Sequence, residues 1–171
     1  MLRRFARVVL LLALAVGLFG FARTLGVHTD LASLDPAFRT KVEKVIAKLE
    51  ADGHAVRVVT TWRDPRRQDL VYVFGRLGSR LGRGPGTMVR GGGSCHNRLA
   101  DGEPASVAVD LRPRRSADHA EQVRFFRALG RAANARTLRW GGDWKRRDPL
   151  WAKDDLGWDP GHVEDARMCK G

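Results

Sequence analysis

The sequence predicts a single α+β domain, in which a small antiparallel sheet is flanked by helices. The chain has 171 residues and a hydrophobic fraction of 43%, which suffices for one core of ordinary size. The predicted elements follow in the order helix, strand, helix, strand, helix, strand, strand. We read this order as an α+β arrangement with a small antiparallel sheet.

The first 22 residues are predicted to be an export signal or a membrane anchor, ahead of one domain over residues 23–171. A basic start precedes the uncharged run Val8 to Phe21, which has the length of a signal-peptide hydrophobic region and is short for a membrane span. Small residues suit cleavage after Ala22. Cleavage is favoured over retention, and the protein is expected to be periplasmic or extracellular.

The formal net charge of +12 favours an anionic partner. Nucleic acid, acidic lipid and anionic cell-wall polymer all match that sign, although the scattered arginines are also consistent with simple compositional bias. An export signal and the absence of any nucleic-acid-binding motif argue against nucleic acid. We therefore expect cell-wall polymers as possible partners, membrane contact only through the N-terminal segment, and a monomer.

The first half of the domain is predicted as helix, strand, helix and loop. Asp35-Pro36 can cap and begin a helix that ends at Gly53. A β-branched strand follows over 55–60. The turn after it leads to a second helix over 65–74. The Gly- and Arg-rich stretch 75–93 lacks apolar periodicity and is predicted to be a long loop over the functional site.

The second half is predicted as strand, helix, strand and strand. Residues 106–111 form an alternating strand that runs into Arg112-Pro113. Residues 117–134 carry an apolar stripe at helical spacing. A strand over 138–140, a polar loop over 145–157 and a final strand over 162–164 complete the domain.

Two histidines and two aspartates in these elements suggest a metal site. His96 ends a Gly-rich turn, Asp110 lies on an alternating strand, and His162 follows a Pro-Gly turn. Two imidazoles and a carboxylate suit one catalytic Zn²⁺ with a position left for water, and Asp159 could then act as the base. Arg63, after the first strand, could stabilise the developing oxyanion. By spacing alone, a pair of ordinary hydrogen-bonded histidines is favoured over a metal site.

Four segments together resemble the VanY-like zinc peptidases, which include D-alanyl-D-alanine carboxypeptidases and the L-alanyl-D-glutamate peptidases of many phage endolysins. They span Leu31 to Glu164 in family order. The family's "YRS…RQ…LY…GR" is resembled by Thr61-Trp62-Arg63 with Arg67-Gln68 and residues 71–76, and its "SxH…AxD" by Ser94-Cys95-His96 with Ala108-Val109-Asp110. A tryptophan motif of the L-alanyl-D-glutamate branch is resembled by Trp140-Gly141-Gly142-Asp143-Trp144, and the family's "DxPHFE" by Asp159-Pro160-Gly161-His162-Val163-Glu164.

The resemblance implies a hedgehog/D-Ala-D-Ala-peptidase-like fold and a zinc-dependent hydrolysis of the peptidoglycan stem peptide. It implies the same zinc ligands, Asp159 as catalytic base and Arg63 as the group that polarises the scissile carbonyl. Substrate-lining or ligand-supporting roles would fall to Ser94, Gln68, Trp140 and Asp143. The tryptophan motif favours an L-alanyl-D-glutamate endopeptidase. A D-alanyl-D-alanine carboxypeptidase and a non-catalytic zinc-binding cell-wall module are the alternatives.

The chain departs from the family pattern in two places, the interval between His96 and Asp110 and Val163, where an aromatic residue is usual. Residues 97–109 make a longer interval between His96 and Asp110 than is usual, and the excess in 98–105 is expected to be a surface insertion.

Cys95 and Cys169 are the two cysteines of the chain. If both histidines bind one metal, these cysteines could come close enough for a disulfide, which an exported protein favours. Free thiols, or Cys95 as a ligand in place of His96, are the other possibilities.

Overall fold

The fold is described by residues 26–80, 87–115, 118–145 and 150–169 of a computed structural model. The predicted export segment, residues 1–22, lies outside these ranges. Within them, no helix combines the length and hydrophobicity that a membrane span requires.

A four-stranded antiparallel sheet forms the centre, in the order β1 (Val56–Thr60), β4 (Ala108–Pro113), β6 (His162–Glu164) and β5 (Arg139–Trp140). On β4, Asp110 is paired with Thr60 of β1 and with His162 of β6. The register of β1 and β4 shifts between Val58 and Thr60. Such irregularities often lie beside functional sites, where they redirect side chains. The predicted antiparallel sheet and the α+β class are confirmed.

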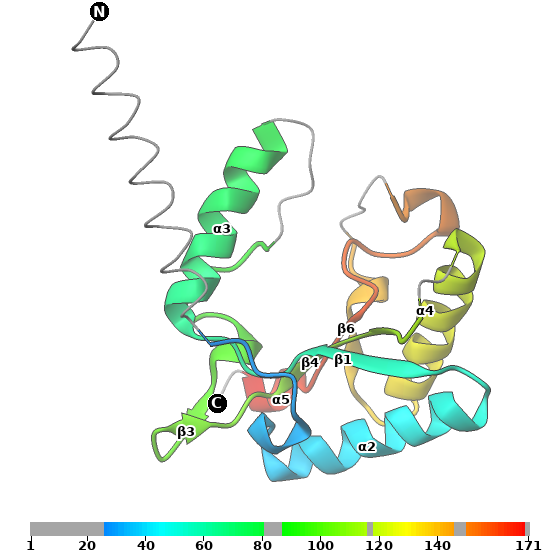
Figure 1. The fold of residues 1–171 in the computed structure, drawn as a ribbon, viewed down its shortest axis with the longest axis horizontal. Helices are drawn as coiled ribbons and strands as arrows, with labels where there is room; N and C mark the ends of the chain where they lie inside the picture. Colours follow the sequence, from blue (N-terminus) through cyan, green and yellow to red (C-terminus); the bar gives the residue numbers. More distant parts are fainter. Residues whose placement is uncertain (1–25, 81–86, 116–117, 146–149, 170–171) are drawn as a thin grey trace, which may run out of the picture.

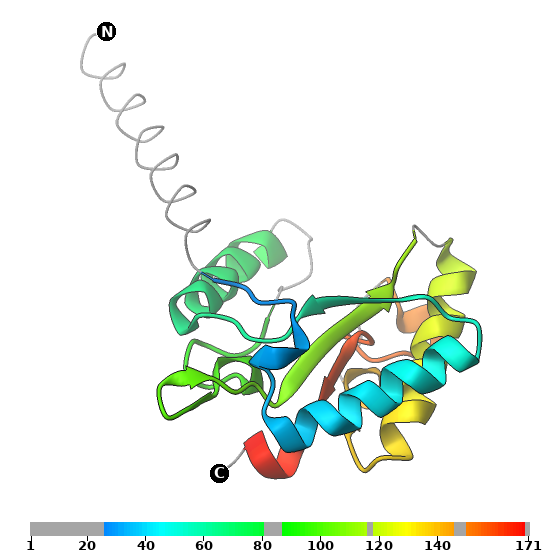
Figure 2. The same cartoon turned by 60° about the horizontal axis from the view of Figure 1, so that its bottom comes forward.

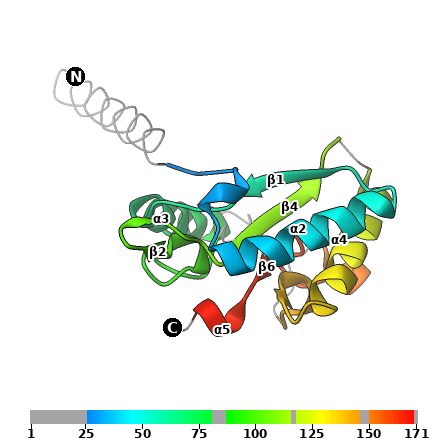
Figure 3. The ribbon, with the colours of Figure 1, turned by 90° about the horizontal axis from the view of Figure 1, so that it is seen from below.

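Helices α2 (Pro36–Ala51) and α4 (His119–Asn134) lie side by side across one face of the sheet (Figures 2 and 3). Asp35 caps α2 and Asp118 caps α4, each through its side-chain oxygen. Their apolar stripes pack against β-strand residues in a single core. Its largest fully buried members include Phe38, Val42, Val45, Leu49, Leu111, Phe125, Phe126, Leu129 and Val163.

Helix α3 (Pro65–Arg80) stands apart from this two-helix layer (Figure 1). The predicted helix ended at Phe74, so the predicted loop is wrong over residues 75–80. A glycine in a helix interior costs only about 1 kcal/mol relative to alanine, and Gly75 is therefore tolerated. Residues 81–86 lie outside the described ranges, and the chain returns toward the sheet from Thr87.

The interval between His96 and Asp110 contains a small exposed hairpin, β2 (Leu99–Ala100) and β3 (Glu103–Pro104). Its turn residues Asp101 and Gly102 have φ values of 52° and 85°, as a two-residue type I′ turn requires. The expected surface insertion is thus a hairpin. The shorter elements are η1 (Leu31–Ser33), η2 (Cys95–Asn97), η3 (Gly141–Asp143), η4 (Ala152–Asp154) and α5 (Ala166–Cys169).

The segment predicted as a polar loop, residues 145–157, is only partly polar. It includes η4, and the side chains of Trp151 and Leu156 are buried in the core. Trp151 packs edge-on against Phe126 of α4, with ring centroids 5.2 Å apart. This segment therefore covers one end of α4.

Candidate metal centre

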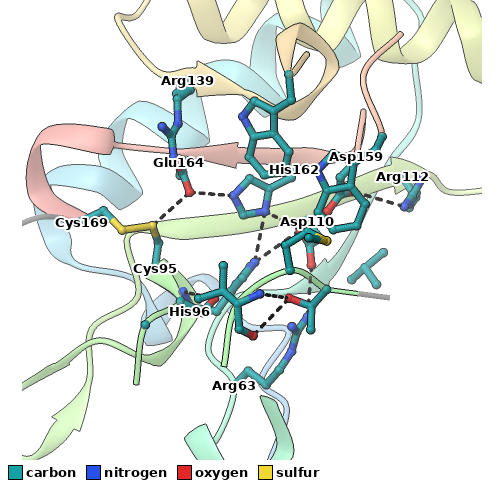
Figure 4. A pocket seen from close by; sticks show the side chains of 18 of the residues that line it. Arg63, Cys95, His96, Asp110, Arg112, Arg139, Asp159, His162, Glu164 and Cys169 are labelled. Carbon is teal, nitrogen blue, oxygen red and sulfur yellow. Dashed lines mark hydrogen bonds and ion pairs between the residues drawn. A yellow bond between two sulfur atoms is a disulfide. The ribbon is translucent and has the colours of Figure 1, made fainter. Parts of the chain in front are cut away.

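His96, Asp110 and His162 converge at the bottom of a cleft on the sheet (Figure 4). His162 Nδ1 lies 3.0 Å from Asp110 Oδ1 and 3.3 Å from His96 Nε2. His96 Nε2 lies 3.4 Å from the same Asp110 oxygen. Three potential ligand atoms therefore face one point.

The sheet places two of these side chains. Asp110 and His162 are cross-strand partners on β4 and β6, and because strand side chains alternate, their neighbours Val109 and Val163 enter the core instead. His96 comes from η2, whose N-cap is Ser94; the Ser94 hydroxyl accepts a hydrogen bond from the His96 amide.

Two hydrogen bonds hold η2 against the segment that follows β1. The Arg63 amide donates to the His96 carbonyl over 3.0 Å, and the Asn97 side-chain amide donates to the Arg63 carbonyl over 2.7 Å. These two bonds fix His96 relative to Arg63, although 33 positions of sequence separate the two residues.

Hydrogen bonds also select which nitrogen of each imidazole faces the cluster. The Thr61 carbonyl, 2.7 Å from His96 Nδ1, can only accept, so Nδ1 carries the proton and Nε2 is free. Glu164 Oε2 lies 3.0 Å from His162 Nε2 and in the same way leaves Nδ1 facing Asp110. Carboxylate or carbonyl partners of this kind orient the histidine ligands of metals.

The cluster fits a zinc ion. Two imidazole nitrogens and one carboxylate oxygen are a ligand set of catalytic zinc sites. Ligands at zinc-bond lengths in a tetrahedron are about 3.3 Å apart, and the three separations here are 3.0, 3.3 and 3.4 Å. His96, Asp110 and His162 would hold the ion.

Neighbouring charges and hydrogen bonds in the cluster shift the pKa values of Asp110 and His162. Burial raises the pKa of Asp110, but the nearby His96 and His162 outweigh burial and hold that pKa well below its ordinary value. Burial lowers the pKa of His162, yet its hydrogen bonds to Asp110 and Glu164 raise it to about 10. A cation is therefore strongly stabilised between these carboxylates.

Asp159 lies at the rim of the cluster and is half-buried. Burial and the negative charge of Asp110 raise the pKa of Asp159, against the opposing charges of His162 and Arg112. A carboxyl group with a raised pKa exchanges protons more readily near neutral pH, as a general base and acid must.

Arg63 contacts the other side of Asp110, with Nη2 3.5 Å from Oδ2. Its Nη1 donates to the side-chain oxygen of Gln68 over 2.6 Å. Gln68 is fully buried, and its amide group lies 2.8 Å from both Thr87 Oγ1 and the Val89 carbonyl. Gln68 thus connects the guanidinium to the segment that returns from α3.

The Trp140 to Trp144 motif supports the loop that carries Asp159. Buried Trp140 donates from Nε1 to the Pro160 carbonyl over 2.7 Å, and it does not line the cleft. A Cβ at Gly141 would collide with the Asp159 carbonyl oxygen, so a glycine is required for this close approach. Asp143 is exposed outside the cleft and accepts from Asn134 over 3.3 Å. Trp144 lies beside His162, with ring centroids 5.2 Å apart.

The cleft measures about 660 Å³, a size typical of small-molecule and peptide sites. Sequence reasoning did not assign three of its charged residues: Arg112, Arg139 and Glu164. Arg112 and Glu164 each lie two positions after a predicted ligand on the same strand, and this period-two spacing was an available signal. Arg139, which pairs with Glu164, had no such signal.

Cys95 and Cys169 form a disulfide, with Cα atoms 5.2 Å apart. It connects η2, immediately before His96, to the C-terminal helix α5. Glu164 Oε2 lies 3.0 Å from Cys95 Sγ. Cys95 therefore supports the site from behind and is not free to replace His96 as a ligand.

The structure thus combines an α+β fold with a candidate metal centre of two histidines and one aspartate. By sequence, the chain matches no protein-family model and no curated protein. By structure, it resembles VanYB in complex with D-alanine-D-alanine, with a TM-score of 0.51 and 14% identity over 80% of this chain and 75% of the other. It also resembles the vancomycin resistance D,D-pentapeptidase VanY in complex with Zn(II), with a TM-score of 0.52 and 14% identity over 80% and 76%. The chain has the fold of the VanY-like peptidases, as its motifs predicted.

Proposed function

We propose that this protein is a zinc-dependent peptidase that hydrolyses a bond in the peptidoglycan stem peptide. The convergence of His96 Nε2, Asp110 Oδ1 and His162 Nδ1 within 3.4 Å carries the proposal. The Zn(II) complex of VanY, which shares the fold, supports the choice of metal. Bound zinc would supply a Lewis acid that makes water more acidic and polarises a carbonyl.

The residues around the cluster divide the remaining work. Asp159 accepts a proton from the attacking water and delivers it to the leaving amine nitrogen as the carbon–nitrogen bond breaks. Arg63, held by Gln68, donates hydrogen bonds to the oxygen on which negative charge develops. Both groups are present, which argues against a non-catalytic zinc module.

Two bonds are candidates for cleavage. The Trp140 to Trp144 motif supports an L-alanyl-D-glutamate endopeptidase. The likeness to VanYB, whose structure contains D-alanine-D-alanine, supports a D-alanyl-D-alanine carboxypeptidase. Either reaction places the protein outside the cytoplasm, and the Cys95–Cys169 disulfide supports an oxidising compartment.

The test is digestion of purified muropeptides by the full-length protein, with fragments identified by mass. Loss of a single C-terminal residue would identify a carboxypeptidase. Release of the peptide that follows L-alanine in the stem would identify an endopeptidase. Asp159→Ala should lower the rate by about 10²- to 10⁴-fold while bound zinc remains near one ion per chain. Asp52→Ala, at the exposed end of α2, is the matched control. Unchanged hydrolysis in Asp159→Ala would rule out the catalytic assignment.

A further inference from the structure

Arg112 is a cleft arginine for which the proposed reaction has no role. It follows Asp110 by two positions on β4, so both side chains project from the same face of the sheet. Figure 4 shows it beside Asp159 and apart from Arg63. Its guanidinium lies over the Phe126 ring, 5.1 Å from the centroid. The stacking fixes the group without occupying its N–H donors.

The three cleft arginines differ in the hydrogen bonds and ion pairs that their guanidinium groups already make within the protein. Arg63 is hydrogen-bonded to Gln68 and contacts Asp110. Arg139 pairs directly with buried Glu164. Within the described ranges, the one ion pair of Arg112 is with Asp159 at 3.8 Å, which is too long for a hydrogen bond, and its guanidinium donates no hydrogen bond. Its side chain is 34% exposed toward the cleft. A fixed guanidinium with free donors suits bidentate binding of a carboxylate.

The position of Asp159 indicates which part of a substrate Arg112 can reach. Because Asp159 returns its proton to the leaving nitrogen, that nitrogen must lie on the Asp159 side of the cluster. Arg112 is on the same side. We propose that Arg112 binds a free carboxylate on the residue that carries the leaving nitrogen, and so makes the enzyme selective for peptides with an anionic leaving residue.

This inference rests on the proposed function and narrows its substrate class. Two kinds of peptide present such a carboxylate. One is a chain end, whose terminal carboxylate is next to the scissile bond. The other is an internal residue that continues through its side-chain carboxyl and keeps its α-carboxylate free. The chemistry at Arg112 is the same for both, and the experiment separates them.

The experiment uses the zinc-loaded full chain and two pairs of synthetic peptides. Each pair differs only in a carboxylate or carboxamide on the leaving residue, which is terminal in one pair and side-chain-linked in the other. The unsubstituted protein should prefer the acid by about 10- to 100-fold in kcat/KM, in the pair that matches its natural bond. Arg112→Gln should lose this preference, so that the acid and the amide are cut with similar kcat/KM. Arg115→Gln, an exposed residue just beyond β4, removes the same charge and should keep the preference.

Other outcomes would overturn the inference. An equal loss on acid and amide in Arg112→Gln would mean that Arg112 acts through Asp159 or through stability, and no loss would mean that it has no role. Calorimetric binding of the leaving product, as free acid and as amide, gives a second readout. If no peptide is cut but the acid binds more tightly through Arg112, the proposed function fails and this inference survives. If the product binds equally well as acid and as amide, and equally well to Arg112→Gln, the inference fails even where the peptides are cut.

Discussion

His96 Nε2 and His162 Nδ1 lie 3.3 Å apart, although 66 positions separate the residues in sequence. They use different ring nitrogens because each ring is held by its other nitrogen, His96 by the Thr61 carbonyl and His162 by Glu164. The pair is therefore already oriented as ligands before any ion is added.

Replacement of either histidine should abolish stoichiometric zinc binding. We expect His162→Ala to reduce bound zinc from about one ion per chain to nearly none after dialysis, because two remaining ligands do not complete a catalytic site. Elemental analysis of the purified protein measures this. His54→Ala, which lies away from the cleft, should retain its zinc. Full zinc retention in His162→Ala would contradict the ligand assignment.

Gln68 should affect the rate and not the metal. Gln68→Leu keeps the buried volume similar but removes the hydrogen bonds to Arg63, Thr87 and Val89. A misplaced guanidinium should reduce kcat/KM by about 10- to 100-fold, with zinc content unchanged. Steady-state kinetics beside elemental analysis checks both. An equal loss of zinc and activity would show that Gln68 supports the whole cleft, and Gln122→Leu on α4 serves as control.

The disulfide should contribute substantially to stability. Cys95 and Cys169 are separated by 74 positions, and closing a loop of that length stabilises a fold by about 4 kcal/mol in the chain-entropy model. We expect the Cys95→Ser/Cys169→Ser double variant to lose about 2–4 kcal/mol of unfolding free energy. Urea unfolding at fixed zinc concentration measures it, because bound ligand itself shifts stability. An unchanged midpoint would show that packing alone holds α5.

The ion pair between Lys41 and Asp165 should make stability depend on pH in the acid range. Lys41 Nζ lies 2.6 Å from Asp165 Oδ2, and the Asp165 side chain is 4% exposed. Burial raises the pKa of Asp165, but the hydrogen bond and charge of Lys41 and two backbone amides outweigh burial and lower it. Because the native pKa is lowered, ionised Asp165 adds to the free energy of unfolding above about pH 4. This contribution is lost as the pH falls through the native pKa.

Asp165→Asn should therefore lower the unfolding free energy by about 1 kcal/mol at pH 7, since Lys41 is partly solvated. The difference between variant and unsubstituted protein should shrink below pH 4. Urea unfolding between pH 3 and pH 7 measures it. A difference that stays constant across this range would show that the charge of Asp165 is not involved.

The sequence alone determined the elements that build the core. Asp35-Pro36 and the stripe of Phe38, Val42, Val45 and Leu49 sufficed to predict α2, because capping and helical periodicity are local properties. The alternation around Asp110 likewise predicted β4. The four motifs together predicted the fold of the family that they resemble, because their order along the chain carries information that no single motif has.

Only the tertiary structure decided how these pieces meet. The pairing of β4 with β6 sets Asp110 opposite His162, and this register depends on contacts between residues far apart in sequence. The extension of α3 past Phe74 runs through Gly75, where local propensity alone favours a loop. The position of Arg112 between Phe126 and Asp159 also arises only when strand, helix and loop come together. Local sequence specifies which side chains are available, whereas distances and charges within the cleft are properties of the packed chain.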